Sequence, residues 1–545
     1  MTMKILLAPF MFLIVFQTYS FSQSTLHYID KSATGNNNGT SWQNAWQSFS
    51  AISWNSIKAG DTVYISGGTD STIYYETLKI PDGKSGSQGS PIVITKGIDT
   101  GHNGIVILDG SNIPDSPAVY ISNCSYITIS NLYTRYWLSY LTNLGTFFVD
   151  GSDHIIIENN KILAWDQGLK ISNSNNCIFR NNSYETPAFI ANQTDGIYAT
   201  FNTDNIYEGN YINISNGSPD DHNDCFQGQN EGPCIIRDNI FMHSGASALK
   251  PIHSQGIFDK YSNGLHQYIN NLIYMPNKST STQEMDDAVL DQQNPTSQYP
   301  GNGQPASVIA INNTVVGAST HTFGFQTSNL IAKNNLVILL DNIAEIRYPS
   351  GINKSDIDYN LYYANNQVGN IIIGAQYSLS DWQGMGYDMH SINADPKLTP
   401  GFLLKPGSPA IDAGTDVSTY GVTTDIEGNH RPYGSNYDIG AYEYQGFTST
   451  ENDVTTTPKN FVLFQNYPNP FNPGTNISFS IPSPGIVKIV IYDMLGKEVA
   501  ELINSELPAG KHSIYFNGSN VSSGLYIYTL EADNFKASKK MLLLK

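Results

Sequence analysis

Three short stretches hold side chains that are suited to acid–base chemistry. They supply Asp195, Asp224 and Lys250, in a chain in which only 14 % of the residues are charged. Two carboxylates held side by side cannot both ionise cheaply, so one keeps its proton or a cation binds between them. Such a pair suits general acid–base catalysis, and a neighbouring lysine could remove a proton. We therefore take all three as candidate catalytic residues, and the two aspartates also as candidate calcium ligands. The stretches read QTDGIY at 193–198, HNDCFQ at 222–227 and SALKP at 247–251.

A sequence repeat sets the spacing of these stretches. Four segments each begin 14 residues before an asparagine, because 160 − 146, 182 − 168, 210 − 196 and 239 − 225 are equal. A fifth start, Ala248, follows 23 residues after the fourth (248 − 225). The segments contain short β-branched and aromatic runs broken by Asn, Gly and Ser, which predict strands and turns. Matching cores with connections of varying length predict a solenoid, here a parallel β-helix with rungs about 4.8 Å apart.

Stacked rungs place equal repeat positions above one another. We therefore expect Asp195 to lie on Asp224 and then on Ser247. Three positions after this column, a second one is expected to contain Lys170, Tyr198, Gln227 and Lys250. These positions and two nearby histidines define our candidate substrate-binding residues, which are Lys170, Tyr198, His222, Gln227 and His253.

The same register predicts three structural columns. The repeat asparagines form a ladder of side-chain amides, the positions three before them form a core stack, and the positions between alternate in charge on the outside. The ladder is Asn160, Asn182, Asn210 and Asn239, with Asn131 on an earlier rung. The core stack is Ile157, Phe179, Tyr207 and Ile236, and the charged column is Glu158, Arg180, Glu208 and Arg237.

This pattern resembles the right-handed parallel β-helix (pectate-lyase-like) superfamily over roughly residues 25–445. The resemblance implies an all-β fold and an extracellular protein directed at a polysaccharide or a cell-surface glycan. Within it, the TDG at 194–196 and the DC at 224–225 are similar to the NTDG and DDC motifs of the polygalacturonase family. That similarity implies a glycoside hydrolase with Asp195 as base and Asp224 as acid, although Asn223 replaces the first aspartate of DDC.

Two other interpretations stay open. Lyases of this fold often use a basic side chain with calcium, which implies Lys250 as the base, Asp195 and Asp224 as calcium ligands, and Lys170 or His253 as the group that neutralises a uronate. The third interpretation is a non-catalytic adhesin or glycan-binding solenoid, in which the aspartates are turn residues and the tyrosines stack on sugars.

Composition excludes some classes of partner. The formal net charge is −19, with 28 Lys and Arg against 47 Asp and Glu, so no basic face is expected for nucleic acid. Residues 1–22 predict a secretory signal peptide, with Lys4 before an apolar run that is too short to span a bilayer. No later segment predicts a transmembrane helix. Cys177 and Cys234 share a repeat position two rungs apart, too far for a disulfide, and the cysteine spacing matches no zinc site.

The chain divides into four parts in this prediction. A signal peptide at 1–22 is followed by a β-helix at 23–445, which begins with a cap containing an amphipathic helix from Trp42 to Ile52 and ends in a segment that closes the last rung. A Thr-rich linker at 446–459 leads to an immunoglobulin-like sandwich at 460–545.

The tail has a specific resemblance of its own. The run NYPNPFNP at 466–473 and the GLY at 524–526 are similar to the C-terminal sorting domain of type IX secretion substrates. The resemblance implies contact with the type IX machinery and a location outside the cell or on the outer-membrane surface. We expect a monomer, with no certain cofactor beyond the possible calcium.

Overall fold

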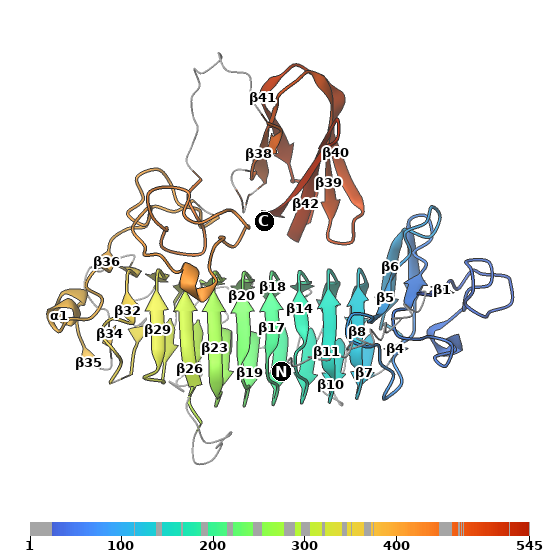
Figure 1. Ribbon diagram of the computed structural model, residues 1–545, viewed down its shortest axis with the longest axis horizontal. Helices are drawn as coiled ribbons and strands as arrows, with labels where there is room; N and C mark the ends of the chain where they lie inside the picture. Colours follow the sequence, from blue (N-terminus) through green and yellow to red (C-terminus); the bar gives the residue numbers. More distant parts are fainter. Residues whose placement is uncertain are drawn as a thin grey trace, which may run out of the picture.

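The computed structural model describes most of the chain outside the predicted signal peptide and linker. The residues described are 24–113, 115–137, 144–164, 167–186, 195–214, 222–243, 253–276, 289–295, 306–318, 322–340, 346–349, 351–364, 372–373, 375–399, 401–445, 460–466, 469, 471, 473–522 and 524–543. They form a long coil of three parallel sheets with a separate sandwich of antiparallel strands beside it (Figure 1). In these residues no helix has both the length and the apolar composition that a membrane crossing requires.

Each complete turn of the coil passes through one strand of each sheet. Sheet 1 contains β4 (Leu78–Lys79), β7 (Val119–Ser122), β10 (Phe147–Asp150), β13 (Leu169–Ser172), β16 (Ile197–Thr200), β19 (His222–Gln229), β22 (His253–Lys260), β25 (Leu290–Gln292), β28 (Phe323–Phe325) and β31 (Ile346–Arg347). Sheet 2 contains β1 (Leu26–Ile29), β2 (Thr62–Ile65), β5 (Ile92–Lys96), β8 (Ser125–Ser130), β11 (Asp153–Glu158), β14 (Ile178–Arg180), β17 (Asn205–Glu208), β20 (Cys234–Arg237), β23 (Gly264–Ile269), β26 (Ala306–Ile311), β29 (Leu330–Lys333) and β32 (Ile357–Asp358). Sheet 3 contains β3 (Ser71–Tyr74), β6 (Ile105–Asp109), β9 (Tyr133–Trp137), β12 (Lys161–Ala164), β15 (Ser183–Glu185), β18 (Tyr211–Ile214), β21 (Ile240–His243), β24 (Leu272–Met275), β27 (Thr314–Gly317), β30 (Leu336–Leu339), β33 (Leu361–Ala364) and β36 (Ile392–Asn393). A short antiparallel pair, β34 (Ile372–Ile373) and β35 (Ala375–Gln376), lies near the C-terminal end of the coil.

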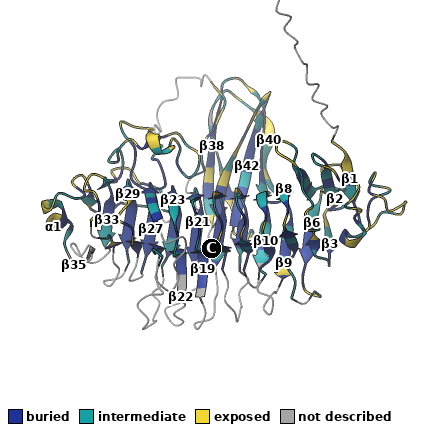
Figure 2. Cartoon of the chain, turned by 60° about the horizontal axis from the view of Figure 1, so that its bottom comes forward, coloured by how far each residue is buried: buried dark blue, intermediate teal, exposed yellow. Residues whose placement is uncertain are grey.

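Alternating side chains from the three sheets fill the inside of the coil. On sheet 1 the inward column contains Val149, Ile171 and Ala199, all completely buried. On sheet 2 the predicted core stack is confirmed: its four members are at most 1 % exposed, and the rings of Phe179 and Tyr207 stack with centroids 5.4 Å apart. The strands are accordingly mostly buried in Figure 2.

The asparagine ladder is confirmed and is longer than the sequence suggested. At each step an amide Nδ2 donates to the Oδ1 of the next asparagine, as from Asn160 to Asn182 at 3.0 Å. The ladder runs on through Asn210, Asn239, Asn271, Asn313 and Asn335 to Asn360. The prediction for Asn131 is wrong, because Leu132 holds the ladder position on that rung and its backbone N–H donates to Asn160 Oδ1. Asn131 instead takes the left-handed conformation (φ 61°) that precedes the ladder position.

The predicted column of alternating charges is also confirmed. Arg180 pairs with Glu158 at 2.6 Å, and Arg237 pairs with Glu208 at 2.6 Å. Because these pairs lie at the surface, each adds little to stability.

The N-terminal helix prediction is wrong. The segment from Trp42 to Ile52 contains one turn of 3-10 helix, Phe49–Ala51, and is otherwise irregular. Side chains of Asn38, Ser41 and Asn44 bond to neighbouring backbone N–H groups, which offers the chain an alternative to helical hydrogen bonds. Trp46 still reaches the core, where it is 1 % exposed.

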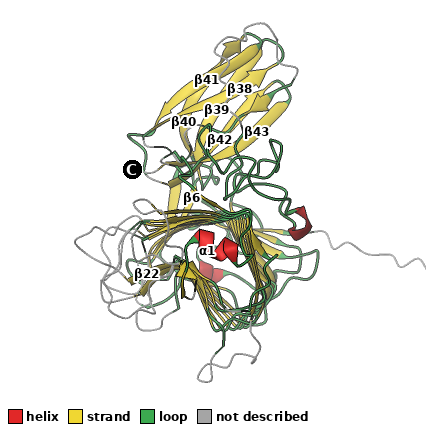
Figure 3. Cartoon of the chain, turned by 90° about the vertical axis from the view of Figure 1, so that its left-hand side faces the viewer, coloured by secondary structure: helices red, strands yellow, loops and turns green. Residues whose placement is uncertain are grey.

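The prediction that residues 401–445 close the last rung is wrong. The helix α1 (Leu379–Gly384) covers that end of the coil instead (Figure 3). Its Trp382 side chain is buried. The 401–445 segment runs along the outside, where Leu404 and Ile439 pack on Leu336. The segment lies outside the coil because the outer surfaces of sheets 2 and 3 carry apolar side chains, and the segment covers them.

The tail forms the predicted sandwich. One sheet contains β37 (Val462–Leu463), β38 (Gly474–Ile481) and β41 (Gly510–Asn517). The other contains β39 (Gly485–Asp493), β40 (Glu498–Leu507), β42 (Gly524–Ala532) and β43 (Phe535–Leu543). The sandwich has its own core and contacts the coil through Met494, Leu525 and Leu542, which pack against Tyr211 and Met242.

Candidate functional site

The two candidate aspartates lie on adjacent rungs at the start of sheet 1 strands. β16 and β19 pair with Tyr198 opposite Gln227, which places Asp195 next to Asp224. The backbone N–H of Asp224 donates to Asp195 Oδ1 at 3.2 Å, and the Gln167 amide donates to Asp195 Oδ2 at 3.4 Å. The predicted stacking of Asp195 on Asp224 in adjacent rungs is therefore confirmed.

The predicted fourth rung is wrong. Asp224 is opposite Gln255, not Ser247, and Gln227 is opposite Phe258, not Lys250. This rung is 31 residues further along the chain (258 − 227) rather than the predicted 23. Connections between rungs vary freely in length, so only backbone pairing identifies the next strand. Lys250 and Ser247 lie outside the described residues.

The two candidate histidines are partners in this register. His222 begins β19 and His253 begins β22, and their backbones pair directly. The structure describes the backbone there and not the two side chains, so their role as substrate ligands stays a prediction.

An outward column of aromatic and basic side chains crosses sheet 1. Its members alternate with the buried inward residues and are aligned by parallel pairing from β4 to β22. Lys79 Nζ lies 4.9 Å from the centre of the Tyr120 ring, and the Tyr120 and Phe148 rings are 5.2 Å apart. In order, this aromatic–basic column is Lys79, Tyr120, Phe148, Lys170, Tyr198, Gln227 and Phe258.

Three of the predicted substrate-binding residues are neighbours in this column. Lys170 Nζ lies 5.3 Å from the centre of the Tyr198 ring, and Tyr198 is followed by Gln227. Tyr120, Phe148 and Phe258 were missed. Phe148 had a usable signal, because it lies two positions after the repeat start Thr146, as Lys170 does after Gly168.

A second outward column lies beside the first on the same strands. It offers hydroxyl, amide and ammonium groups from Ser172, Thr200, Gln229 and Lys260. The Ser172 and Thr200 hydroxyls are 2.9 Å apart, and the Tyr198 hydroxyl donates to Gln229 Oε1 at 3.1 Å. Such groups are suited to hydrogen bonding with the hydroxyls of a sugar chain.

Burial controls the electrostatics of this face. Desolvation and the nearby Asp195 raise the pKa of the Tyr198 hydroxyl, which therefore stays neutral and able to donate. On the rung after Phe258, desolvation raises the pKa of Asp291 to about 6. Asp195 and Asp224 are both 0 % exposed, so neither carboxylate reaches solvent in this conformation.

The side-chain oxygen atoms at the start of these strands are of the types that bind a hard cation. Besides the two carboxylates it offers the amide oxygen of Gln167, which is buried and accepts no hydrogen bond within the part of the chain that the structure describes. Calcium binds through carboxylate and amide oxygens of this kind.

Two families match parts of the chain. Residues 145–275 match the family described as the right handed beta helix region, and residues 465–544 match the secretion system C-terminal sorting domain. No curated protein matches the chain in sequence.

Solved structures are similar only at a distance. Pectate lyase Pel9A has 16 % identity and a TM-score of 0.42, over 78 % of this chain and 97 % of that chain. A GH136 lacto-N-biosidase from Eubacterium ramulus has 10 % identity and a TM-score of 0.35, over 63 % and 64 %. A rhamnogalacturonan lyase has 14 % identity and a TM-score of 0.34, over 68 % and 87 %.

The family matches agree with the architecture, since residues 145–275 lie in the coil and residues 465–544 lie in the sandwich. The chain is thus a right-handed parallel β-helix protein with a C-terminal type IX sorting domain, which directs its export to the cell surface or the extracellular space.

Proposed function

We propose that this exported β-helix binds a uronate-containing polysaccharide along the outer face of sheet 1. The aromatic–basic column carries the proposal, because Lys79 and Lys170 each lie beside an aromatic ring on a neighbouring strand. Aromatic rings stack on the apolar faces of sugars, and lysine ammonium groups attract uronate carboxylates. The strands are about 4.8 Å apart, which is similar to the length of one sugar unit in an extended chain.

Charge also favours an acidic glycan at this place. The whole chain is strongly acidic, yet the described part of this face presents three lysines, Lys79, Lys170 and Lys260, beside one aspartate, Asp150, which is aligned with Ser172. Lys260 Nζ lies 4.2 Å from the centre of the Phe258 ring, but that ring is 2 % exposed, so the ring-and-cation pairs open to a ligand are those of Lys79 and Lys170. A neutral glycan would use the rings but not the ammonium groups.

Cleavage of the bound chain is the second candidate function. The adjacent carboxylates of Asp195 and Asp224, at the margin of the same face, favour it. In a hydrolase one would protonate the glycosidic oxygen and the other would activate water. In a lyase they would hold calcium, which would neutralise the uronate carboxylate. Their complete burial supports binding as the main function.

The test is a binding and product assay on the exported chain. We expect retention on polygalacturonate or alginate gels, weakened by salt, and little retention on an uncharged glucan. Equal retention on the acidic and neutral polymers, or none on either, would contradict the proposal. Unsaturated uronate products would identify a lyase, and new reducing ends without them a hydrolase.

A further inference from the structure

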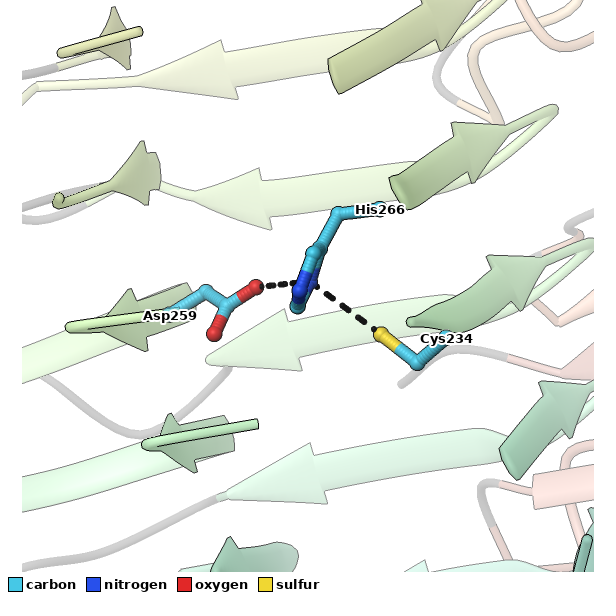
Figure 4. A group of neighbouring side chains, drawn as sticks. All are labelled: Cys234, Asp259 and His266. Carbon is cyan, nitrogen blue, oxygen red and sulfur yellow. Dashed lines mark hydrogen bonds and ion pairs between the residues drawn. The ribbon is translucent and has the colours of Figure 1, made fainter. Parts of the chain in front are cut away.

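A group of polar side chains lies inside the coil, away from the proposed glycan face. Asp259 points inward from β22, Cys234 from β20 and His266 from β23, and one ligand atom from each lies within 4.8 Å of the others (Figure 4). Asp259 and His266 are 0 % exposed, and Cys234 is 2 % exposed. Ionisable residues of these types are seldom fully buried unless they are paired.

The imidazole is oriented as a metal ligand would be. His266 Nε2 lies 3.0 Å from the backbone oxygen of Asn263, so it carries a proton and donates. The other nitrogen, Nδ1, faces Asp259 Oδ2 at 2.6 Å and Cys234 Sγ at 3.3 Å. Metal-bound histidines commonly donate their second N–H to a backbone carbonyl in this way.

Buried oxygen atoms near the group lack hydrogen-bond partners. Asp259 Oδ1 and Glu231 Oε2 accept no hydrogen bond from the described residues, although Glu231 is also 0 % exposed. A buried acceptor without a donor costs about 1–3 kcal/mol, and a bound cation would remove that cost. Both side chains pack against Gly228, since a Cβ added there would lie 2.7 Å from Asp259 Oδ1 and 3.3 Å from the Glu231 methylene carbon Cγ.

We propose that Cys234, Asp259 and His266 bind a structural zinc ion inside the coil. Thiolate, imidazole and carboxylate ligands are those that Zn²⁺ takes in tetrahedral sites. Standard zinc bond lengths place N and S ligands about 3.6 Å apart and N and O ligands about 3.4 Å apart. The Nδ1–Sγ distance of 3.3 Å is near that value, and the Nδ1–Oδ2 distance of 2.6 Å must widen.

The enclosed position determines when the ion binds. All three side chains lie within the coil, so zinc must be present as the rungs close over it. The chain should therefore be unfolded in denaturant with a chelator and refolded either with zinc chloride or with EDTA. We expect about one tightly held zinc per chain after desalting, and a higher melting temperature than for the EDTA-refolded chain.

A buried cysteine at the same repeat position provides the control. Cys177 points into the core two rungs before Cys234 and is 0 % exposed. We expect Cys177→Ala to keep the zinc and Cys234→Ala to lose most of it. Refolding with cobalt should give a thiolate-to-cobalt charge-transfer band that Cys177→Ala keeps and Cys234→Ala loses.

Each result decides the proposal. Folded wild-type chain that holds no zinc after refolding with zinc would overturn it, and so would a cobalt charge-transfer band that survives in Cys234→Ala. If Cys234→Ala does not fold, the wild-type metal content and cobalt band decide alone, since an unmetallated hydrogen-bond network gives neither.

Discussion

The ammonium group of Lys170 lies 5.3 Å from the centre of the Tyr198 ring, one strand away on sheet 1. A cation and a ring at this distance form one recognition unit on the proposed glycan face. Sheet 3 holds a similar pair, in which Lys161 Nζ lies 5.5 Å from the centre of the Tyr133 ring. The two pairs differ mainly in the face on which they lie, so the second is a control for the first.

The first prediction concerns glycan affinity. Lys170→Ala and Tyr198→Ala should each weaken binding to polygalacturonate about fivefold, since each loses an interaction of about 1 kcal/mol. Titration calorimetry would measure the change. Lys161→Ala and Tyr133→Ala should leave the affinity unchanged, and an equal loss in all four variants would show that sheet 1 is not the binding face.

The second prediction concerns the asparagine ladder. Asn239 donates to Asn271 Oδ1 and to the Tyr207 carbonyl, and its own Oδ1 accepts from Asn210. Asn239→Ala should lower the free energy of unfolding by about 3 kcal/mol, because several buried groups lose their partners. Chemical denaturation followed by circular dichroism would measure it. Asn393→Ala, at an exposed asparagine on β36, should change stability by less than about 0.5 kcal/mol.

The third prediction concerns pH. Desolvation raises the pKa of the buried Asp291 to about 6 from an ordinary value of 3.8, so between these values the folded chain binds more protons than the unfolded chain. The stabilisation from this group is complete below pH 3.8 and is lost as the pH rises through 6. Over this pH range the free energy of unfolding should fall by about 3 kcal/mol.

Asp291→Asn tests this assignment. The amide oxygen can still accept from Gln293, which donates to Asp291 Oδ2 at 3.0 Å, but it has no proton to lose. Denaturation curves between pH 4 and 7 should therefore fall less steeply for Asp291→Asn than for the wild type. The exposed Asp82→Asn should follow the wild type, and an Asp291→Asn chain with the wild-type slope would exclude Asp291 as the source.

The fourth prediction concerns the contact between sandwich and coil. Leu525 is 8 % exposed and packs with Tyr211 and Met242 of the coil. Leu525→Asp would place a carboxylate in this apolar contact and should separate the two parts while each stays folded. Small-angle scattering should show a larger radius of gyration. Ile486→Asp, at a residue of the same sandwich that is 66 % exposed, should leave the radius unchanged.

Local repetition explains what was predictable. The coil, the ladder from Asn160 to Asn239 and the stacking of Asp195 on Asp224 follow from a spacing of 14 residues that recurs in each repeat core. Side chains at equal repeat positions must stack when backbones pair in parallel, so no knowledge of distant contacts was needed. The tail was predictable for another reason, because the run NYPNPFNP at 466–473 is specific to the sorting domain.

Where the sequence repeat fails, only the tertiary structure shows which residues become neighbours. The residue beside Gln227 is Phe258 and not the predicted Lys250. The connection between those two rungs is longer than the repeat predicts, and only backbone pairing sets the register. The tertiary structure also brought Cys234, Asp259 and His266 together from three strands on two sheets. Their spacing along the chain carries no signal of a metal site, because the coil joins them across its interior and not along a local motif.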